Sequence, residues 1–345
     1  MREEIELKKQ QQLNHLLEGL PDYVRSYIDY CLGTLNRSYN TVISYTYDIT
    51  RFFKFLIARN PLISDYPDIT IEVLDQLTPL DMQEYMSYLR LSDENDERVH
   101  NGSSARARKL CSLRTFFQYL FVYKGLSTNI AKLVETPRVI KKKKPRLTDE
   151  KAVDLLENTK ACVVKETARS YKERTRLRDT AIITTLIYTG IRVSELCNLN
   201  IDDINRDTMT ILVTRKGGRQ EEVLINNEVR KALDDYIDFE RESYDDANRA
   251  LFLSSRRASS TRLTSRSVEL IVRDFGLSIG EHVTPHTLRR TFGSKLYNQT
   301  GDPYITATAL GHKNIQTTVD FYASMDEQRK EMIRNVKYDN DTKED

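Results

Sequence analysis

The sequence predicts a mainly α-helical protein with one small β-hairpin, an α+β fold in two units. The chain has 345 residues, which is longer than one typical hydrophobic core requires. Apolar residues recur at helical spacing along most of it, and one segment with paired glycines shows the pattern of a hairpin. The expected division is an N-terminal extension at 1–20, a helical domain at 21–137, a basic linker at 138–147, a second domain at 148–337 and a disordered tail at 338–345.

The region 21–137 is expected to form a small bundle of four or five helices. In the segment 38–56 apolar residues follow one another at helical spacing, and Ser38 or Asn40 can cap the helix. The segment 110–120 carries a second apolar stripe of the same kind. The polar stretch 92–104 is expected to be a loop between two helices.

The distribution of charge is more informative than its sum, because the formal net charge is only +2. Basic residues are concentrated in the Pro-containing linker, whereas acidic residues gather at 93–97 and in the tail. Segregated charge favours a protein with one phosphate-facing side, although a merely solvated basic linker is the simpler alternative. The candidates for contact with DNA are Lys141, Lys142, Lys143, Lys144, Arg106 and Arg108.

The second unit is expected to begin with a helix capped by Thr148 or Asp149 and to contain little strand. The segments 209–213 and 221–225 flank the turn RKGGR, whose paired glycines allow positive φ in a hairpin. Helices are then expected to continue to about Val336.

Cysteines and apolar runs narrow the class of protein. Cys31, Cys111, Cys162 and Cys197 lie far apart without CxxC spacing, which argues against zinc and disulfides and favours reduced core residues. No apolar run approaches the ~20 residues that span a bilayer, and the N-terminus lacks the apolar core of a signal peptide. We therefore expect a cytoplasmic protein with no membrane partner.

Arg192 follows an apolar segment that ends at Thr189 and Gly190. Glu195 comes three residues later, within reach of Arg192 if the two share one helical turn. A cation held by a neighbouring carboxylate can form a rigid anion clamp. A surface ion pair at the start of a helix explains this pattern equally well.

His286 and Arg289 share one face of a helix that Thr284 is expected to cap and Pro285 to begin. The unpaired amides and the dipole of a first helical turn already favour an anion. A histidine at such a place is more often a cap or a core residue. Its pairing with Arg289 favours a phosphate receptor.

Three further residues indicate a function only in combination with Arg192, His286 and Arg289. They are Lys216, His312 and Tyr322. Lys216 occupies the hairpin turn, where it can reach a phosphate but can also be a solvent-exposed tip. His312 follows the bend at Leu310-Gly311, ten residues before Tyr322, which is one of 19 tyrosines.

These side chains match the needs of phosphodiester cleavage. Two arginines can clamp the nonbridging oxygens on which charge develops, and a lysine can protonate the departing 5′ oxygen. A histidine can accept the phenol proton or hydrogen-bond the phosphate, which a tyrosine nucleophile needs because its free pKa is near 10. The sequence contains no acidic cluster at metal spacing and no GxxxxGK[ST] loop, so no metal, ATP or other cofactor is expected. The candidate catalytic residues are Arg192, Lys216, His286, Arg289, His312 and Tyr322.

The order Arg…Lys…His-x-x-Arg…Gly-His…Tyr resembles the tyrosine site-specific recombinase (phage integrase) family, most closely its Xer-type, single-recombinase members. The combination of TGIRVSEL, PHTLRRTF and ALGH is highly specific, and the resemblance covers nearly the whole chain. It implies that Tyr322 is the nucleophile, forming a 3′-phosphotyrosine, and that Lys216 is the general acid. It further implies two clamp arginines, two assisting histidines and a supporting acid, at Arg192, Arg289, His286, His312 and Glu195.

The resemblance also implies a fold and partners. The helical core-binding domain and the catalytic domain would form a clamp around duplex DNA that carries a specific recombination site. Four subunits would assemble on two synapsed sites, with a C-terminal segment within 325–336 docking onto a neighbour. A DNA translocase or accessory DNA-binding proteins are possible further partners, and chromosome dimer resolution is the expected role.

The sequence departs from the family pattern in one residue and in one interval. Three other functions are alternatives. Arg290 stands where the family commonly has His, and the interval from His312 to Tyr322 is one residue longer than in many Xer proteins. A mobile-element integrase or excisionase of the same family shares the outline. A type IB topoisomerase shares the chemistry, and an architectural DNA-binding protein would have lost it.

Overall fold

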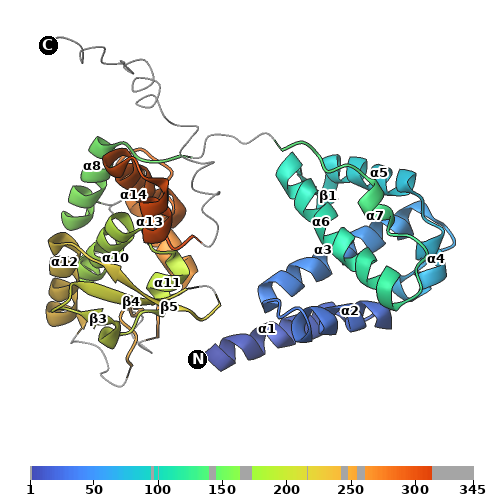
Figure 1. Cartoon of the computed structure of the whole chain (residues 1–345), viewed down its shortest axis with the longest axis horizontal. Helices are drawn as coiled ribbons and strands as arrows, with labels where there is room; N and C mark the ends of the chain where they lie inside the picture. The colour runs from blue at the N-terminus through green and yellow to red at the C-terminus, as the bar shows by residue number, and fades with distance from the viewer. Residues whose placement is uncertain are drawn as a thin grey trace, which may run out of the picture. The chain divides into compact units, whose positions relative to one another are not determined.

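The computed structural model confirms a mainly helical fold, and its described residues include two small antiparallel sheets, one of two strands and one of three (Figure 1). It describes residues 2–94, 97–99, 101–139, 145–163, 173–215, 217–241, 248–254 and 261–312, with 2–5, 91–94 and 97–99 described by their backbone alone. The chain divides into two compact units, Met1–Lys142 and Lys143–Asp345, each with its own hydrophobic core. We call them unit 1 and unit 2.

Unit 1 is built from helices, several of which begin at the expected caps. The Ser38 side chain accepts a hydrogen bond from the amide of Thr41, so Ser38 rather than Asn40 caps its helix. The helices of unit 1 are α1 (Arg2–Leu16), α2 (Asp22–Gly33), α3 (Tyr39–Arg59), α4 (Ile71–Asp75), α5 (Pro79–Tyr88), α6 (Ser103–Tyr123) and α7 (Ile130–Leu133).

The core of unit 1 is aromatic, because the apolar stripes of α3 and α6 face each other. Phe52 and Phe117 meet edge to face with their ring centroids 5.9 Å apart, a favoured geometry for aromatic pairs. Leu13 and Leu17 are also buried in this core. The segment 1–20 therefore contributes to the packing of unit 1.

Two expectations for unit 1 are wrong. The stretch 92–104 is not a plain loop, because β1 (Ser92–Glu94) and β2 (Glu97–Val99) pair as antiparallel strands and α6 begins at Ser103. Cys111 is exposed on α6 and is not a core residue, whereas the other three cysteines are buried and all four are free thiols. Residue type alone does not decide burial, because the position on the helix face places Cys111 in solvent.

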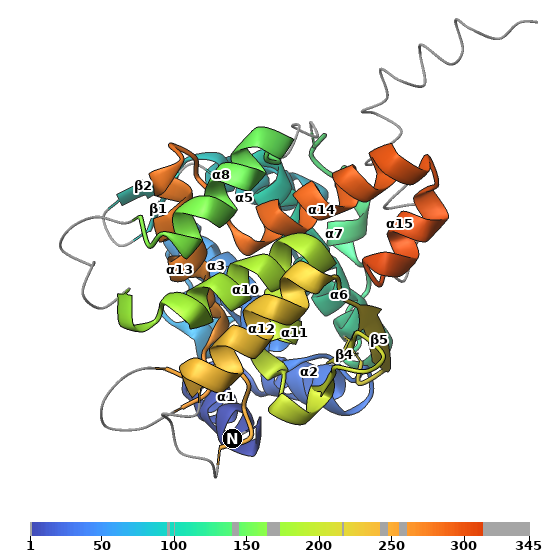
Figure 2. The same ribbon diagram turned by 90° about the vertical axis from the view of Figure 1, so that its left-hand side faces the viewer.

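Unit 2 is organised around α10 (Arg176–Thr189), whose residues are buried along nearly its whole length. Figure 2 shows α10 among the helices that cover it. Thr148 is the N-cap of the helix that begins at Asp149. The other α-helices in the described residues of unit 2 are α8 (Asp149–Lys160), α11 (Val193–Asn198), α12 (Asn227–Phe239), α13 (Ser265–Ser278), α14 (Pro285–Thr300) and α15 (Pro303–Ala309).

The sheet of unit 2 has the order β3-β4-β5, with strands β3 (Ile204–Asn205), β4 (Thr210–Thr214) and β5 (Gln220–Leu224). Thr214 pairs with Gln220, so the predicted hairpin is confirmed and its turn comprises 215–219. Gly217 and Gly218 have φ of 94° and 83°, values that favour glycine. Within the described part of the chain, no helix combines the length and apolarity needed to cross a membrane.

Candidate functional site

The pairing of Arg192 with Glu195 at the start of α11 is confirmed. Oε2 of Glu195 accepts a hydrogen bond from the Arg192 amide at 2.8 Å, and Oε1 accepts one from Nη1 at 2.7 Å. The Glu195 side chain is 3% exposed, whereas that of Arg192 is 37% exposed. The carboxylate is therefore buried beneath a guanidinium that still reaches the surface.

Burial raises the pKa of Glu195, but hydrogen bonds from the Arg192 amide and guanidinium and the charges of Arg215 and Arg192 outweigh it. The net effect is a pKa below the usual value. Glu195 thus stays ionised and continues to orient Arg192.

Arg289 lies on α14, is almost fully buried and is oriented by two backbone carbonyls. Its Nη1 donates to the carbonyl of Gly190 at 2.6 Å, and its Nη2 donates to that of Leu310 at 2.5 Å. Gly190 ends α10 with φ of 61°, and a Cβ there would lie 2.5 Å from the ring of Phe292. Only glycine therefore fits at this helix end, and its carbonyl is free to accept from Arg289.

The end of α15 forms a Schellman turn that positions His312. The His312 amide donates to the Ala307 carbonyl and the Gly311 amide to the Thr308 carbonyl, both at 2.9 Å, with Gly311 at φ of 59°. The Leu310 carbonyl remains available to Arg289, and the Gly311 carbonyl accepts from Nη2 of Arg192 at 3.3 Å. One turn thereby orients both arginines.

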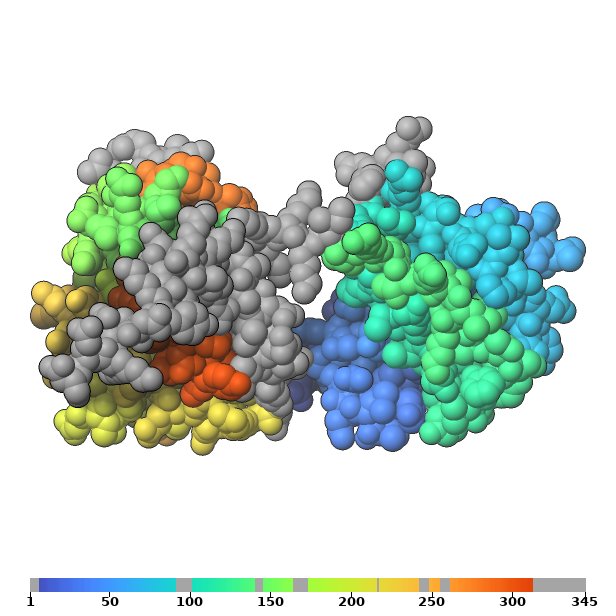
Figure 3. Space-filling model, turned by 45° about the horizontal axis from the view of Figure 1, so that its top comes forward, coloured from blue at the N-terminus to red at the C-terminus, as the bar shows by residue number. Residues whose placement is uncertain are grey.

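In Figure 3 the orange-red end of the described part of unit 2 reaches the surface beside yellow residues from the region of the sheet and α12. The contacts between the Gly311 turn and the hairpin agree with this view. We call this group, which includes Arg192, Glu195, Arg289 and the turn at Gly311, the cluster of unit 2. It is assembled from segments that are far apart in the sequence.

His312 is half-buried beside this group of cations. Burial, followed by the charges of Arg289, Arg192, His286 and Arg215, lowers the pKa of His312 to about 4. The imidazole is therefore neutral at physiological pH, and it can accept a proton or donate a hydrogen bond.

His286 lies exposed on the first turn of α14, as its motif predicts. Thr284 caps that helix through the amide of Thr287, and Pro285 is the first helical residue. His286 affects the pKa of His312 through its charge, which places it in the same cluster. The structure thus brings together five predicted residues, Arg192, Glu195, His286, Arg289 and His312.

Arg215 belongs to the cluster but was not predicted from the sequence. Its Nη1 donates to Oε2 of Glu195 at 2.8 Å, and its side chain is 6% exposed. The available signal was an arginine that directly follows the last residue of β4 in RKGGR. Its partner Glu195 lies 20 residues away, so no local spacing rule identifies the pair.

The remaining predicted residues fall into two groups. Lys216, Tyr322 and Lys141–Lys144 lie outside the described residues. Arg106 and Arg108 lie on α6 in unit 1, where Arg108 makes two hydrogen bonds of 2.8 Å to the carboxylate of Asp48. At least part of the Arg108 side chain is thus engaged within unit 1.

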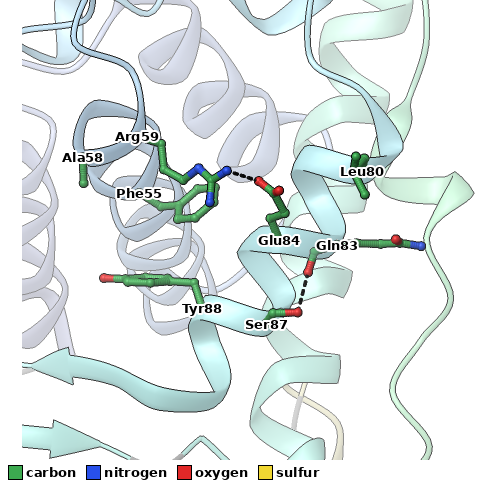
Figure 4. Close-up of a pocket in the computed structure, with 8 residues that line it drawn as sticks. All are labelled: Phe55, Ala58, Arg59, Leu80, Gln83, Glu84, Ser87 and Tyr88. Carbon is green, nitrogen blue, oxygen red and sulfur yellow. Dashed lines mark hydrogen bonds and ion pairs between the residues drawn. The ribbon is translucent and has the colours of Figure 1, made fainter.

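A separate pocket in unit 1 contains none of the predicted residues (Figure 4). It lies between α3 and α5, with the rings of Phe55 and Tyr88 on one side. Arg59 pairs with Glu84 across it at 2.5 Å. This pocket does not contribute to the cluster of unit 2.

Within the cluster, Arg192 and Arg289 are held in fixed orientation near a neutral histidine, His312. Guanidinium groups in fixed orientation bind a phosphate through paired hydrogen bonds. A neutral imidazole beside them can exchange a proton with a group attacking that phosphate. The chemistry that this geometry supports best is transfer at a phosphoryl group.

Comparisons with known proteins agree with this chemistry. The phage integrase family matches residues 145–329, and the phage integrase N-terminal SAM-like domain matches residues 24–122. Tyrosine recombinase XerS of Streptococcus agalactiae serotype III (strain NEM316) is 30% identical over 355 residues, covering 95% of this chain and 98% of the relative. Tyrosine recombinase XerC of Caldanaerobacter subterraneus subsp. tengcongensis is 30% identical over 326 residues, covering 91% and 86%.

Solved structures show the same fold at lower identity. The pre-cleavage complex of XerH site-specific recombinase bound to difH substrate has a TM-score of 0.67 and 20% identity, covering 96% of this chain and 89% of that one. A lambda integrase tetramer bound to a Holliday junction has a TM-score of 0.60 and 18% identity, covering 93% and 79%. From the family matches and the curated relatives, the chain belongs to the phage integrase family of tyrosine recombinases, enzymes that cleave and rejoin DNA.

Proposed function

We propose that the cluster of unit 2 binds the scissile phosphate of a specific recombination site and that Tyr322 attacks that phosphate. The observation that carries the proposal is the fixation of Arg192 and Arg289 by Glu195 and by three helix-end carbonyls. Preorganised donors of this kind stabilise developing charge without reorganisation during the reaction.

The proposed reaction exchanges one phosphodiester for another. The Tyr322 oxygen bonds to phosphorus as the bond to the 5′ oxygen breaks, leaving a 3′-phosphotyrosine and a free 5′ hydroxyl. Lys216 protonates the departing oxygen, and His286 or His312 accepts the phenol proton or hydrogen-bonds the phosphate. The 5′ hydroxyl of a partner strand then reverses the step. The phosphotyrosine bond keeps the energy of the broken phosphodiester, so the strands can be resealed without ATP.

We further propose that the helical unit and the catalytic unit form a clamp on duplex DNA and that four subunits act on two synapsed sites. The XerH structure with its difH substrate and the lambda integrase tetramer on a Holliday junction support this assembly by analogy. The basic linker 138–147 would contact phosphates, and a segment within 325–336 would dock onto a neighbouring subunit.

The biological role that we propose is Xer-type chromosome dimer resolution in the cytoplasm. Similarity to XerS and XerC over more than nine-tenths of this chain supports it. A DNA translocase or accessory DNA-binding proteins would direct the reaction. A mobile-element recombinase would use the same chemistry, and mapping of the genomic DNA that the protein protects would distinguish the two.

The test uses a duplex that contains a genomic sequence bound by the protein and that is nicked beside the cleavage position. Cleavage then releases a short fragment with the free 5′ hydroxyl, so the covalent complex cannot be rejoined. Wild type is expected to form a covalent protein–DNA band in denaturing gels, whereas Tyr322→Phe forms none and still binds the duplex. A covalent band with Tyr322→Phe, or no band with wild type, would contradict the proposal.

A further inference from the structure

Arg215 is part of the β4–β5 turn through its main chain. Its amide donates to the Arg219 carbonyl at 2.7 Å, and its carbonyl accepts from the Gly218 amide at 3.0 Å. These two bonds close the turn that contains Lys216, so a shift of the turn also shifts Arg215.

The guanidinium of Arg215 is directed inward, between two carboxylates. Nη1 donates to Glu195 at 2.8 Å and Nη2 to Glu221 at 3.2 Å, and the side chain is 6% exposed. A buried charge is tolerated only when it is paired, so these contacts hold the guanidinium in place. Because Glu195 also binds Arg192, one carboxylate connects the hairpin to a clamp arginine.

The same guanidinium lies against the backbone at Gly311. A Cβ at Gly311 would lie 2.6 Å from Cζ of Arg215 and 2.7 Å from its Nε, so any side chain there would displace Arg215. The carbonyls at this turn accept from Arg192 and from Arg289. Arg215 therefore contacts both structures that orient the two arginines, the carboxylate and the turn.

We propose that Arg215 is a positioning residue for the recombinase reaction. It connects the β4–β5 turn to Glu195 and to the Gly311 turn. Arg192 and Arg289 are therefore correctly oriented only while the β4–β5 turn keeps the position seen in the structure. The inference rests on the proposed function, because it assigns Arg192, Arg289 and Lys216 to the reaction. Both terminal nitrogens of Arg215 already donate to carboxylates, so we assign it a positioning role and not a contact with the phosphate.

The test compares Arg215→Met, which keeps an unbranched apolar stem and loses the charge, with Arg215→Lys, which keeps the charge and loses the planar guanidinium. Single-turnover formation of the covalent complex and DNA affinity are measured separately on the nicked duplex. We expect Arg215→Met to slow cleavage about 100-fold, the effect of an ångström-scale misplacement, with affinity nearly unchanged. Arg215→Lys should be intermediate, because an ammonium cannot span both carboxylates.

Arg206 provides the matched control. It lies between β3 and β4, pairs with Asp234 and Asp238, and has a side chain that is 46% exposed. Arg206→Met is expected to leave the cleavage rate within about twofold of wild type, because exposed ion pairs contribute little.

The pH dependence separates positioning from general loss of structure. The charge of Arg215 helps to lower the pKa of Glu195. Without it that pKa rises, so the acidic limb of the cleavage rate should move to higher pH in Arg215→Met and not in Arg206→Met.

The outcomes are distinct. A folded Arg215→Met that cleaves at the wild-type rate would overturn the inference while leaving the proposed function intact. Should Arg215→Met unfold, Arg215→Lys decides: slow cleavage at unchanged affinity supports the inference, and wild-type cleavage overturns it. A parallel loss of affinity and rate would assign Arg215 to DNA binding instead and also overturns it. Absence of cleavage by wild type would reject the proposed function itself.

Discussion

Each unit buries one carboxylate against two cationic side chains, but the two arrangements serve different purposes. In unit 1, Asp48 is 1% exposed and pairs with Arg108 and Lys109, which joins α3 to α6. In unit 2, Glu195 is 3% exposed and pairs with Arg192 and Arg215. Charge and burial alone do not separate the scaffold from the site.

The two arrangements differ in how the guanidinium groups direct their hydrogen-bond donors. Both carboxylate oxygens of Asp48 bind one guanidinium, that of Arg108, in a bidentate pair. The oxygens of Glu195 are divided between two arginines, and Arg192 directs another nitrogen to the Gly311 carbonyl. In unit 1 the carboxylate therefore joins two helices, whereas in unit 2 it orients two arginines that come from different segments.

Matched neutral substitutions should give the largest contrast between the units. Asp48→Asn is expected to destabilise unit 1 by about 3 kcal/mol, because it leaves a cation without its buried partner. Glu195→Gln should instead slow cleavage about 100-fold by releasing Arg192. Hydrogen exchange can follow each unit separately, and a covalent-complex assay at saturating DNA reports cleavage. Equal cleavage defects in the two variants would show that the comparison has no functional meaning.

Two glycines at helix ends should sharpen the contrast within unit 2. Gly301 and Gly311 have φ of 65° and 59°, but only a Cβ at Gly311 meets another residue, Arg215. Both Ala variants should lose about 1 kcal/mol of stability from the left-handed backbone. Only Gly311→Ala should also slow cleavage, about 10-fold or more, by displacing Arg215.

The result that contradicts this account is a similar cleavage rate for the two variants at equal stability. Thermal unfolding followed by far-UV circular dichroism measures the shared cost, and the nicked duplex measures the difference.

Local sequence rules predicted one half of this site. The cap at Thr284, the first-turn histidine at His286 and the pair Arg192–Glu195 all depend on neighbours within one helical turn. The helical stripes of α3 and α6 and the RKGGR hairpin were accessible for the same reason.

The other half depends on contacts between distant segments. Arg289 binds the Gly190 carbonyl 99 residues away, and backbone carbonyls leave no trace in residue identity. Arg108 pairs with Asp48, 60 residues away, and no local pattern indicates that partner. Its contact with DNA stays a prediction. Sequence periodicity gives the face of a helix and not what packs on that face.

The titration of His312 should make the free energy of unfolding depend on pH. Its pKa is about 4 in the folded protein, below the value of 6.5 in the unfolded chain, so the unfolded chain binds the proton more readily. The free energy of unfolding should therefore rise with pH between about 4 and 6.5, and His312→Gln should remove that part of the rise. An NMR midpoint for His312 near 6.5 would mean that the arginines do not surround it.

The basic linker is expected to contribute least to cleavage itself. Replacing Lys141–Lys144 with Gln should weaken binding to any duplex and flatten the dependence of affinity on salt, because fewer counterions are released. Cleavage at saturating DNA should change little. Unchanged affinity across a salt series would place the basic run in solvent.

The most direct measurement identifies the residue that becomes attached to DNA. The covalent complex formed on the nicked duplex is digested with protease and nuclease, and the nucleotide-bearing peptide is sequenced by mass spectrometry. The account predicts a 3′-phosphate linked to Tyr322. Attachment at any other residue would contradict it.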